Sequence, residues 1–376
     1  MIQPVLLRHQ VEIDAALRRV VMRISNAATR TNIARLQPYY GQIEYHLGWV
    51  NADFSPAASH PGKLLRPTLL LLAYEAAGAW GLVNEADENE ATTTNSEYLN
   101  RALPAAVAIE LTHNFTLIHD DIEDGDIERR YRTTMWKLWG IPQAINTGDG
   151  LFALARLALW GVLDVGVASA IAARLGEMLD RACLTLSEGQ YLDISFESHE
   201  DISVAMYLDM ISRKTGALMR CAAEMGALLG TRDEVIIDRL GSFGYAMGIA
   251  FQVRDDLLGI WASEMELGKT SAGDIYRRKK SLPILHALEQ ASEGDQQFLR
   301  NLYAQEAAIT DEQVEAVLAI FARTKTKAYC QSFLAEQSRL AHDALKSVPR
   351  GGSRVAIQAI QDLEALIRFV EDAARD

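Results

Sequence analysis

Six acidic residues fall within nine positions of LIHDDIEDGDIERR, residues 117–130, and two arginines follow them. The apolar residues before them recur at helical spacing, so we expect a buried helix that runs into Asp120 and stops at Gly125. Residues four apart share a helix face, which places Asp120 and Asp124 one turn apart with Asp121 beside them. Carboxylates are unfavourable at the negative end of a helix dipole, and oxygen-ligated magnesium is the compensation that this pattern suggests.

A second pair of adjacent aspartates, Asp255 and Asp256, lies in FQVRDDLLGIW among strongly apolar neighbours. Taken alone, the first group of acids is typical of a solvated helix end. Two acid pairs embedded in apolar helices, however, would each be costly to bury without positive charge nearby. The two segments together therefore predict a metal cluster bridging two helices.

Basic residues indicate what such metals would hold. Lys63 and Arg66 stand at the start of an apolar helix in PGKLLRP, and Arg129 and Arg130 follow the first acids. Magnesium is often held by carboxylates plus substrate phosphates, whereas arginine and lysine bind phosphate oxygens directly. We therefore expect one diphosphate site with metals and a second, at a helix start, without them.

Composition narrows the classes of function. The chain has 376 residues, 49% of them hydrophobic, and 37 basic against 50 acidic residues give a net charge of −13. This balance argues against broad binding to nucleic acid or to an anionic membrane surface. The cysteines, Cys183, Cys221 and Cys330, lack CxxC spacing, so neither a disulfide framework nor a zinc site is indicated and a cytoplasmic location is expected.

Apolar residues recur at helical spacing along nearly the whole chain, and runs typical of strands are absent, so the sequence predicts an all-α protein. The most apolar windows, 68–83 and 151–173, contain charged residues and indicate buried helices, not membrane spans. No signal peptide is recognised at the N-terminus. No break is long enough to be an interdomain linker, so one domain over residues 1–376 is expected. Helix breaks are predicted at residues 51–63, 84–100, 140–143, 187–190, 292–297 and 348–354.

The ordered motifs resemble those of the trans-isoprenyl diphosphate synthases, the polyprenyl synthetase family that includes farnesyl and geranylgeranyl diphosphate synthases. The resemblance extends from about residue 60 to about residue 285. It rests on GKLLRP, HNFTLIHDDIED, RR, GD at 148–149, GQYLD, KT, FQVRDD, GK and Lys279, in that order. It implies an isoprenoid-synthase helical bundle around a central apolar cavity, flanked by packing and dimer helices, and a homodimer.

The resemblance also implies the reaction. Isopentenyl diphosphate would be condensed with an allylic diphosphate (dimethylallyl, geranyl or farnesyl) after magnesium-dependent ionisation of the allylic partner. Charge developing on the leaving oxygens would be stabilised by metals and lysines. Arginine and lysine anchors would hold the second substrate in line with the allylic cation. Resemblance further suggests that the released diphosphate accepts the proton lost at the end.

Site residues follow from the matched motifs. Three magnesium ions are implied around the allylic diphosphate, with Asp120 and Asp124 as the more direct ligands. The positions matching metal-site aspartates are Asp120, Asp121, Asp124, Asp193, Asp255 and Asp256. Further positions match polar residues of the family that act on the allylic diphosphate or line its metal site: Arg129, Gln190, Lys214, Thr215, Gln252, Lys269 and Lys279. Lys279 would close over the site. The positions matching the isopentenyl diphosphate site are Lys63, Arg66, His113 and Arg130.

Two departures from the family pattern concern these motifs. The second aspartate motif normally has a third aspartate four residues after the first, where this chain has Gly259. Asp255 is therefore expected to carry most of the coordination, with the third ligand absent or supplied through water. The usual glycine and proline after the paired arginines are Tyr131 and Thr133, which we interpret as loop variation that leaves the arginines intact.

Product length is predicted from the helix before Asp120, since one helical turn rises about 5.4 Å, close to the reach of one isoprene unit. Phe115 and Thr116 lie five and four positions before Asp120, and Thr112 lies eight before it. An aromatic residue at the five-before position resembles archaeal-type geranylgeranyl synthases, so a C20 product is the first choice and C15 the second. The alternative is that Phe115 only packs in the core.

Two other functions stay open on the sequence. A class I terpene cyclase shares an aspartate-rich motif and magnesium-dependent ionisation, but it does not need Lys63, Arg66 and His113 for a second diphosphate. A non-catalytic subunit of a heteromeric prenyl synthase would share the fold while losing acids, and Gly259 is the feature that points that way.

Overall fold

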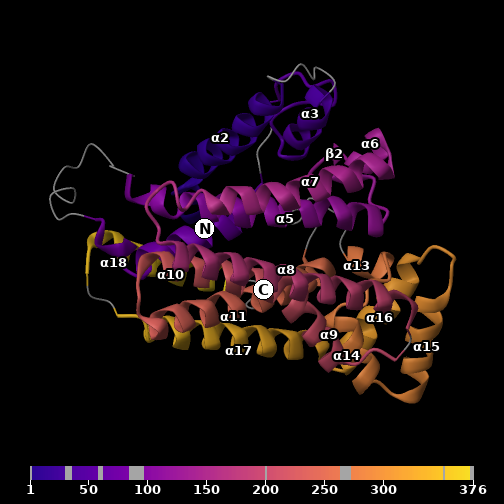
Figure 1. Ribbon diagram of the computed structural model, residues 1–376. Helices are drawn as coiled ribbons and strands as arrows, with labels where there is room; N and C mark the ends of the chain where they lie inside the picture. Colours follow the sequence, from indigo (N-terminus) through magenta and orange to yellow (C-terminus); the bar gives the residue numbers. More distant parts are fainter. Residues whose placement is uncertain are drawn as a thin grey trace. The chain divides into compact units, whose positions relative to one another are not determined.

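The structure is a computed structural model that describes residues 2–29, 36–57, 62–83, 97–199, 201–262, 272–349 and 352–372. Helices form most of it, which confirms the all-α prediction (Figure 1). The chain divides into two compact units. The first comprises Met1–Cys183, Cys221–Gly241 and Val348–Leu363, and the second comprises Leu184–Arg220, Ser242–Ser347 and Glu364–Asp376. One functional domain over 1–376 and a central apolar cavity stay predictions.

The first unit contains the N-terminal helices and a short hairpin. Its complete elements are α1 (Gln3–Leu7), α2 (Gln10–Thr29), α3 (Gln37–His46), α4 (Leu65–Ala76), α5 (Leu103–Glu123), α6 (Met135–Trp139), α7 (Ile141–Trp160), 3₁₀ turns at Ala79–Gly81 and Glu97–Arg101, and strands β1 (Glu128–Arg129) and β2 (Arg132–Thr133). Four further helices contribute segments to both units: α8 (Ser169–Ser198), α10 (Ala217–Gly230), α11 (Glu234–Trp261) and α18 (Arg354–Asp372).

Helices α5 and α7 lie side by side in the first unit (Figure 1). Nearly every residue of α5 from Leu103 to Ile118 is buried, including the polar Glu110, Thr112 and Asn114 among its apolar side chains. A Cβ atom on Gly148 of α7 would lie 2.3 Å from the Nε2 atom of His119, so a larger residue there would displace the His119 side chain of α5. The packing of α7 therefore fixes the helix that carries the first group of aspartates.

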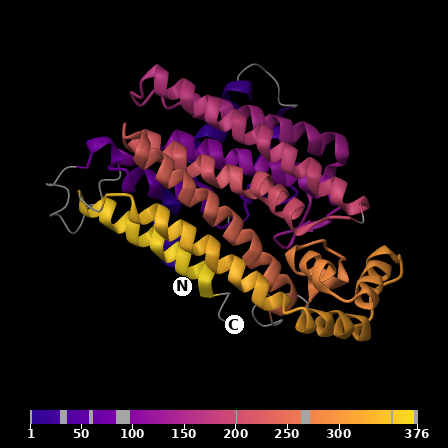
Figure 2. The same cartoon turned by 90° about the horizontal axis from the view of Figure 1, so that it is seen from below.

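The second unit is built from shorter helices. Its complete elements are α9 (Val204–Ile211), a π-helical turn (Ser212–Gly216), α13 (Gly273–Tyr276), α14 (Leu282–Gln290), α15 (Glu293–Ala304), α16 (Asp311–Arg323) and α17 (Thr326–Lys346). Helices α14, α15 and α16 group together, orange in Figure 2. Helix α16 begins with a capping box in which Thr310 and Gln313 satisfy each other's backbone N–H groups.

Most of the predicted helix breaks are confirmed. Helix α7 starts within 140–143, α15 starts within 292–297, and α17 and α18 are separated within 348–354. The described residues of the break predicted at 51–63 likewise lie between α3 and α4, whereas residues 58–61 and much of the break predicted at 84–100 lie outside the described residues. Within the described part of the chain, no helix is long and apolar enough to cross a membrane.

The break predicted at 187–190 is wrong, because α8 continues through it to Ser198. Gly189 has a packing role there: a Cβ atom on it would lie 2.4 Å from the backbone nitrogen of Lys214. The glycine that suggested a helix end thus permits a close contact with the π-helical turn. The hairpin of β1 and β2 was also not predicted, since two-residue strands leave no alternating pattern in the sequence.

Candidate active site

Asp120, Asp121 and Asp124, the first carboxylate cluster, stand at the C-terminal end of α5. The backbone N–H of Asp124 donates to the backbone oxygen of Asp120 at 2.8 Å, so the two residues are one turn apart, as predicted. Gly125 follows with a φ of 68° and ends the helix. Asp124 is exposed and Asp120 half-buried, whereas Asp121 is only 2% exposed.

The buried aspartate of this cluster has a cationic partner. The Nε atom of Arg129 lies 2.5 Å from the Oδ1 atom of Asp121. Burial raises the pKa of the Asp121 carboxyl, and Arg129 acts in the opposite direction by stabilising the charge. Arg129 therefore holds Asp121 in this structure, whereas Asp120 is half-buried and Asp124 is exposed.

Arg129 and the next arginine belong to the hairpin of β1 and β2. The two residues between the strands, Arg130 and Tyr131, have φ angles of 53° and 59°, the left-handed conformation that a two-residue hairpin turn of type I′ requires. Arg132 ties the hairpin to the end of α3, donating to the backbone oxygen of Tyr45 at 2.8 Å. The Tyr45 hydroxyl donates in return to the Thr133 backbone oxygen at 2.7 Å.

The predicted isopentenyl diphosphate residues lie together in the first unit. A Cβ atom on Gly62, whose φ is +88°, would lie 2.7 Å from the Cζ atom of Arg130, so the guanidinium rests against the backbone beside the exposed Lys63. Burial lowers the pKa of His113 well below its usual value, and the nearby Arg66 and Arg130 lower it further. His113 is therefore neutral near pH 7 and faces a strongly positive surrounding.

Glu110 is an acidic member of this cationic cluster that sequence reasoning missed. It is 3% exposed, and Asn114 donates to its Oε1 atom at 2.8 Å. Burial raises its pKa, while Asn114, Arg66 and Arg130 favour the charged form. A single glutamate in an apolar helix gives no sequence signal of its own, because only the fold brings the arginines to it.

In the second unit, Asp255 and Asp256 of α11 differ sharply in exposure. The Asp255 side chain is 65% exposed and lies 3.6 Å from Arg254, whereas Asp256 is fully buried. Both oxygens of Asp256 accept hydrogen bonds. The donors are the Tyr207 hydroxyl at 2.5 Å, the Gln252 side chain at 3.2 Å, the Leu282 backbone N–H at 3.3 Å and the Lys279 ammonium at 3.4 Å.

Lys214 and Thr215 stand in the π-helical turn between α9 and α10. Turns of this kind occur frequently at functional sites. The Lys214 ammonium lies 2.6 Å from the Oδ2 atom of Asp193, and Gln190 is buried on the same helix, α8. The Thr215 hydroxyl reaches the side-chain oxygen of Gln252 at 3.4 Å. Hydrogen bonds therefore connect the π-helical turn to α11 within the second unit.

Gly259, where the family pattern has a third aspartate, is explained by a neighbouring carboxylate. A Cβ atom on Gly259 would lie 2.3 Å from the Oδ2 atom of Asp274, which is 3% exposed and comes from α13. Asp274 thus occupies the space beside Gly259. Asp255, Asp256 and Asp274 together form what is called below the second carboxylate cluster.

Lys279 is the cation of the second carboxylate cluster. Its ammonium lies 3.4 Å from Asp256 and 3.7 Å from Asp274. Burial disfavours the charge, but the two carboxylates outweigh it and raise the pKa of Lys279 above its usual value. Arg277 adds a second cation, 2.7 Å from the Oδ1 atom of Asp274.

The predicted chain-length residues are buried on α5. The Phe115 ring makes edge-to-face contacts with Phe152 of α7, with ring centroids 5.2 Å apart. Thr112 is fully buried, and the Thr116 hydroxyl donates to the backbone oxygen of His113 at 2.8 Å. This packing is compatible both with a floor for a growing chain and with a purely structural role.

The donor atoms suit magnesium, since they are carboxylate oxygens and several of their side chains are half-exposed or exposed. Among the described residues, no three His, Cys, Asp or Glu side chains are already grouped closely enough to hold an ion alone. Magnesium that keeps waters and shares a substrate diphosphate does not need such a group. The predicted residue Lys269 lies outside the described residues.

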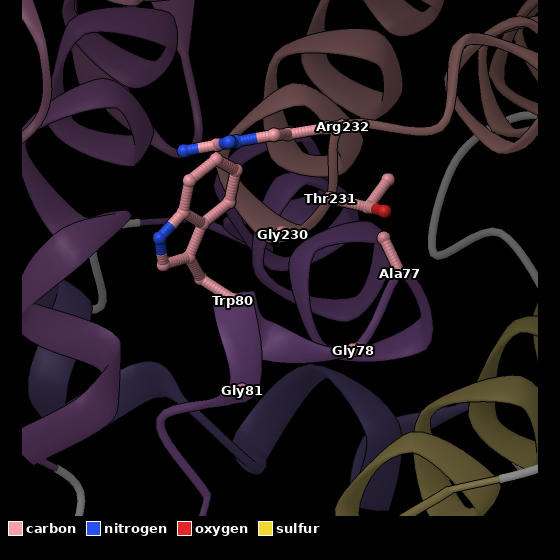
Figure 3. A pocket seen from close by; sticks show the side chains of 7 residues that line it. All are labelled: Ala77, Gly78, Trp80, Gly81, Gly230, Thr231 and Arg232. Carbon is pink, nitrogen blue, oxygen red and sulfur yellow. The ribbon is translucent and has the colours of Figure 1, made fainter.

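A separate open hollow of about 410 Å³ lies elsewhere on the first unit. The Arg232 guanidinium extends over the Trp80 ring at one side of it, and glycines form much of the remaining wall (Figure 3). The ring centroid is 5.0 Å from Arg232 and 4.3 Å from Arg101. None of the predicted site residues lines this hollow.

Comparisons with known proteins agree with these motifs. The sequence model of one family, described as Polyprenyl synthetase, matches residues 48–321. The chain is 40% identical over 284 residues to a geranylgeranyl diphosphate synthase of Mycobacterium tuberculosis, covering 76% of this chain and 75% of that protein. It is 38% identical over 251 residues to a (2E,6E)-farnesyl diphosphate synthase of Mycobacterium bovis, covering 66% of this chain and 64% of that protein.

A solved structure agrees as well. The crystal structure of a polyprenyl synthetase from Streptomyces coelicolor A3(2) superposes with a TM-score of 0.81 and 34% identity, covering 98% of this chain and 99% of that one. The likeness therefore extends over the flanking helices as well as the segment that carries the motifs.

Proposed function

Because the chain belongs to the polyprenyl synthetase family, we propose that it condenses isopentenyl diphosphate with an allylic diphosphate. It is a short-chain trans-prenyltransferase, and the synthases that it resembles make geranylgeranyl or farnesyl diphosphate. The observation that carries this proposal is that the chain has a carboxylate cluster in each unit and, in the first unit, a separate cationic cluster of Lys63, Arg66, His113 and Arg130. Ionising one diphosphate and anchoring another requires both kinds of site.

The exposed and half-buried aspartates are the proposed metal ligands. Asp120, Asp124 and Asp255 would hold magnesium ions, three by resemblance, which supply positive charge that helps the allylic diphosphate depart. Asp121 and Asp256 keep their protein partners and orient these neighbours. Asp274, which is buried beside Gly259, likewise keeps its ion pairs with Arg277 and Lys279 and helps to orient these neighbours.

Lys214 acts on the same leaving group in this proposal, and Lys269 shares the role by resemblance. Its ammonium is presented by the π-helical turn and oriented by Asp193. A fixed positive charge of this kind stabilises negative charge as it develops on the departing oxygens. Gln252 and Thr215 steady the turn through the hydrogen bond between their side chains.

The second substrate binds without metal in this proposal. Lys63, Arg66 and Arg130 contact the diphosphate of isopentenyl diphosphate, and the neutral His113 adds a hydrogen bond. Anchoring at this end holds the double bond in line with the allylic cation, so positioning contributes to the rate. The released diphosphate accepts the proton lost in the last step.

Product length is proposed to be C20, with C15 as the alternative, because Phe115 lies just over one turn before Asp120 on the same buried helix. Phe115→Ala is expected to shift the products to longer chains, as sized by chromatography after dephosphorylation. Phe115→Tyr, which keeps the ring, is the control and should leave the product unchanged. An unaltered product from Phe115→Ala would restrict this residue to core packing.

A homodimer is proposed from the apolar face of α7. Ile141, Ile145, Phe152 and Trp160 recur at helical spacing there, and each is 40–50% exposed. A face of this kind is typical of protein contacts. Light scattering on the purified protein tests the proposal, and a monomer at micromolar concentration would contradict it. The free cysteines support the cytoplasmic location that we propose.

The reaction itself is tested with purified protein, magnesium, isopentenyl diphosphate and each allylic starter in turn. Elongation of at least one starter is expected. Absence of elongation with every starter would contradict a catalytic synthase and favour a non-catalytic subunit. Cyclic hydrocarbon formed from a preformed allylic diphosphate would favour a terpene cyclase.

A further inference from the structure

His46, the last residue of α3, has a buried ring nitrogen that none of the roles above uses. Its Nε2 atom is shielded from solvent and has no hydrogen-bond partner. The other side of the ring is satisfied, since a ring N–H donates to the backbone carbonyl of Asn114 on α5. Because Nε2 has no partner, Nδ1 carries that bond, and the neutral ring directs an unused lone pair away from α5.

The charged groups around this ring are arginines of the hairpin. Burial, and after it Arg130, Arg129 and Arg132, together lower the pKa of His46 to about 3, although the bond to Asn114 acts in the opposite direction. On α5, His113 interacts with the same ring. His46 therefore faces the cationic cluster that holds Arg66, His113 and Arg130.

The backbone on either side of His46 is held by the hairpin. Arg132 donates to the backbone oxygens of Tyr45 and Val50 at 2.8 and 2.5 Å, and its guanidinium lies 4.0 Å from the centre of the Tyr45 ring. These contacts fix the end of α3 against the hairpin. The ring itself is held by its bond to the Asn114 backbone, and turning its unsatisfied nitrogen to solvent would break that bond.

A second unsatisfied nitrogen lies in the same cluster. The Nε atom of Arg66 is buried without a hydrogen-bond partner, and Arg66 interacts with Arg130 and Glu110. Buried polar atoms without partners are rare and costly. Two of them within one cluster of positive charge indicate a place for an anion that accepts hydrogen bonds.

We propose that His46 is a further residue of the isopentenyl diphosphate site, where its Nε2 atom donates a hydrogen bond to a diphosphate oxygen. The inference rests on the proposed function. In the ligand-free protein the arginines keep the ring neutral. A diphosphate reverses the local charge, so the ring takes up one proton from solvent at Nε2 as the ligand binds, becoming an imidazolium that retains its Nδ1 bond to Asn114.

Two substitutions separate binding from structure. His46→Asn can retain a donor near the position of Nδ1 but loses the reach of Nε2, whereas His46→Gln can extend an N–H toward the position of Nε2. We expect His46→Asn to weaken binding of isopentenyl diphosphate by about tenfold or more, as for loss of a hydrogen bond to a charged group. His46→Gln should retain most of the affinity. A purely structural role predicts the reverse order, with the larger loss in His46→Gln.

The measurement is calorimetric titration of the full-length protein with isopentenyl diphosphate in the presence of EDTA, in two buffers with different heats of ionisation. Wild type should take up more protons on binding than His46→Asn. In steady-state assays the KM for isopentenyl diphosphate should rise, with kcat and the KM for the allylic substrate nearly unchanged. His286→Asn, at a buried histidine of the second unit, is the control and should bind as wild type.

The outcomes distinguish this inference from the proposed function. If wild type binds isopentenyl diphosphate without metal and His46→Asn binds equally well with the same proton uptake, the role of His46 is refuted and the proposed function stands. If wild type itself does not bind without metal, the metal-free site of the proposed function fails, and the inference fails with it.

Discussion

In the first carboxylate cluster all three aspartates come from the end of one helix, α5, whereas the second cluster combines two aspartates of α11 with Asp274 of α13. Both clusters contain aspartates that are buried against a cation of the protein: Asp121 against Arg129 in the first, and Asp256 and Asp274 against Lys279 in the second. In each cluster another aspartate is exposed, Asp124 in the first and Asp255 in the second.

The two clusters differ in how the chain positions the third carboxylate. A helix presents residues four apart on one face, so Asp120 and Asp124 are placed by local geometry alone. At Gly259 the same spacing is abandoned, and tertiary packing brings Asp274 into the space. The first cluster should therefore tolerate changes elsewhere in the fold better than the second.

The largest expected effect on stability is at the buried aspartate of the second cluster. Asp256→Ala leaves Lys279 and Tyr207 without their partner and should lower the free energy of unfolding by about 3–5 kcal/mol. Asp255→Ala, at the exposed neighbour, is the matched control and should change it by less than about 0.5 kcal/mol. Denaturant unfolding followed by circular dichroism measures both. Equal losses at the two positions would remove the distinction between buried and exposed aspartates.

The exposed aspartates should instead control turnover. Asp124→Asn and Asp255→Asn are each expected to lower kcat/KM for the allylic substrate by about 10²–10³-fold, because each weakens stabilisation of the departing diphosphate. Folding should be unaffected, as judged by the unfolding midpoint. Glu123→Gln, at an exposed acid between the motif positions, is the control. A loss in Glu123→Gln as large as that in Asp124→Asn would indicate a general charge effect.

Replacing Gly259 with the aspartate of the family pattern tests whether Asp274 occupies the place of that aspartate. Gly259→Asp places a side chain against Asp274 and should lower the free energy of unfolding by about 1–3 kcal/mol, the usual cost of overpacking. Adding Asp274→Gly opens the space again, so the double variant should recover part of this loss. If the effects of the two substitutions on the free energy of unfolding were simply additive, the carboxylates at positions 259 and 274 would not compete for the same space.

Removal of metal should have the smallest effect on the fold. The buried aspartates of both clusters are paired with protein cations, so metal does not hold them in place. Adding EDTA should abolish turnover while shifting the thermal midpoint by no more than about 1 °C, since a ligand that is not bound strongly cannot stabilise the fold. A fall of many degrees in the thermal midpoint would mean that the ions stabilise the fold.

Most of the fold prediction came from the helical spacing of apolar residues. Helix α5, its end at Gly125 and the spacing of the first cluster follow from local rules that act within a few residues. The break predicted at 187–190 failed because Gly189 serves a contact with Lys214, more than twenty positions away. A glycine gives the same signal in sequence for a helix end and for a close contact.

The unpredicted parts of the candidate site depend on tertiary contacts as well. Asp274 and Glu110 acquire their surroundings only when distant segments meet, and the π-helical turn at Lys214 leaves no periodic pattern. Motif resemblance predicted the site residues without indicating which aspartates are buried. Exposure, which the structure supplies, separates the proposed metal ligands from the residues that position them.

Asp120 and Asp121, which are adjacent on α5, provide the most direct test of the division between metal-binding and positioning aspartates. Magnesium is titrated by calorimetry into wild type, Asp120→Asn and Asp121→Asn, each saturated with an allylic thiolodiphosphate that ionises too slowly to react. The proposed roles predict that Asp120→Asn weakens magnesium binding by about tenfold or more, the loss of a direct charged ligand, while Asp121→Asn retains it within about threefold. An equal or larger loss in a folded Asp121→Asn would contradict the assignment of half-buried and exposed aspartates to metal and of buried aspartates to structure.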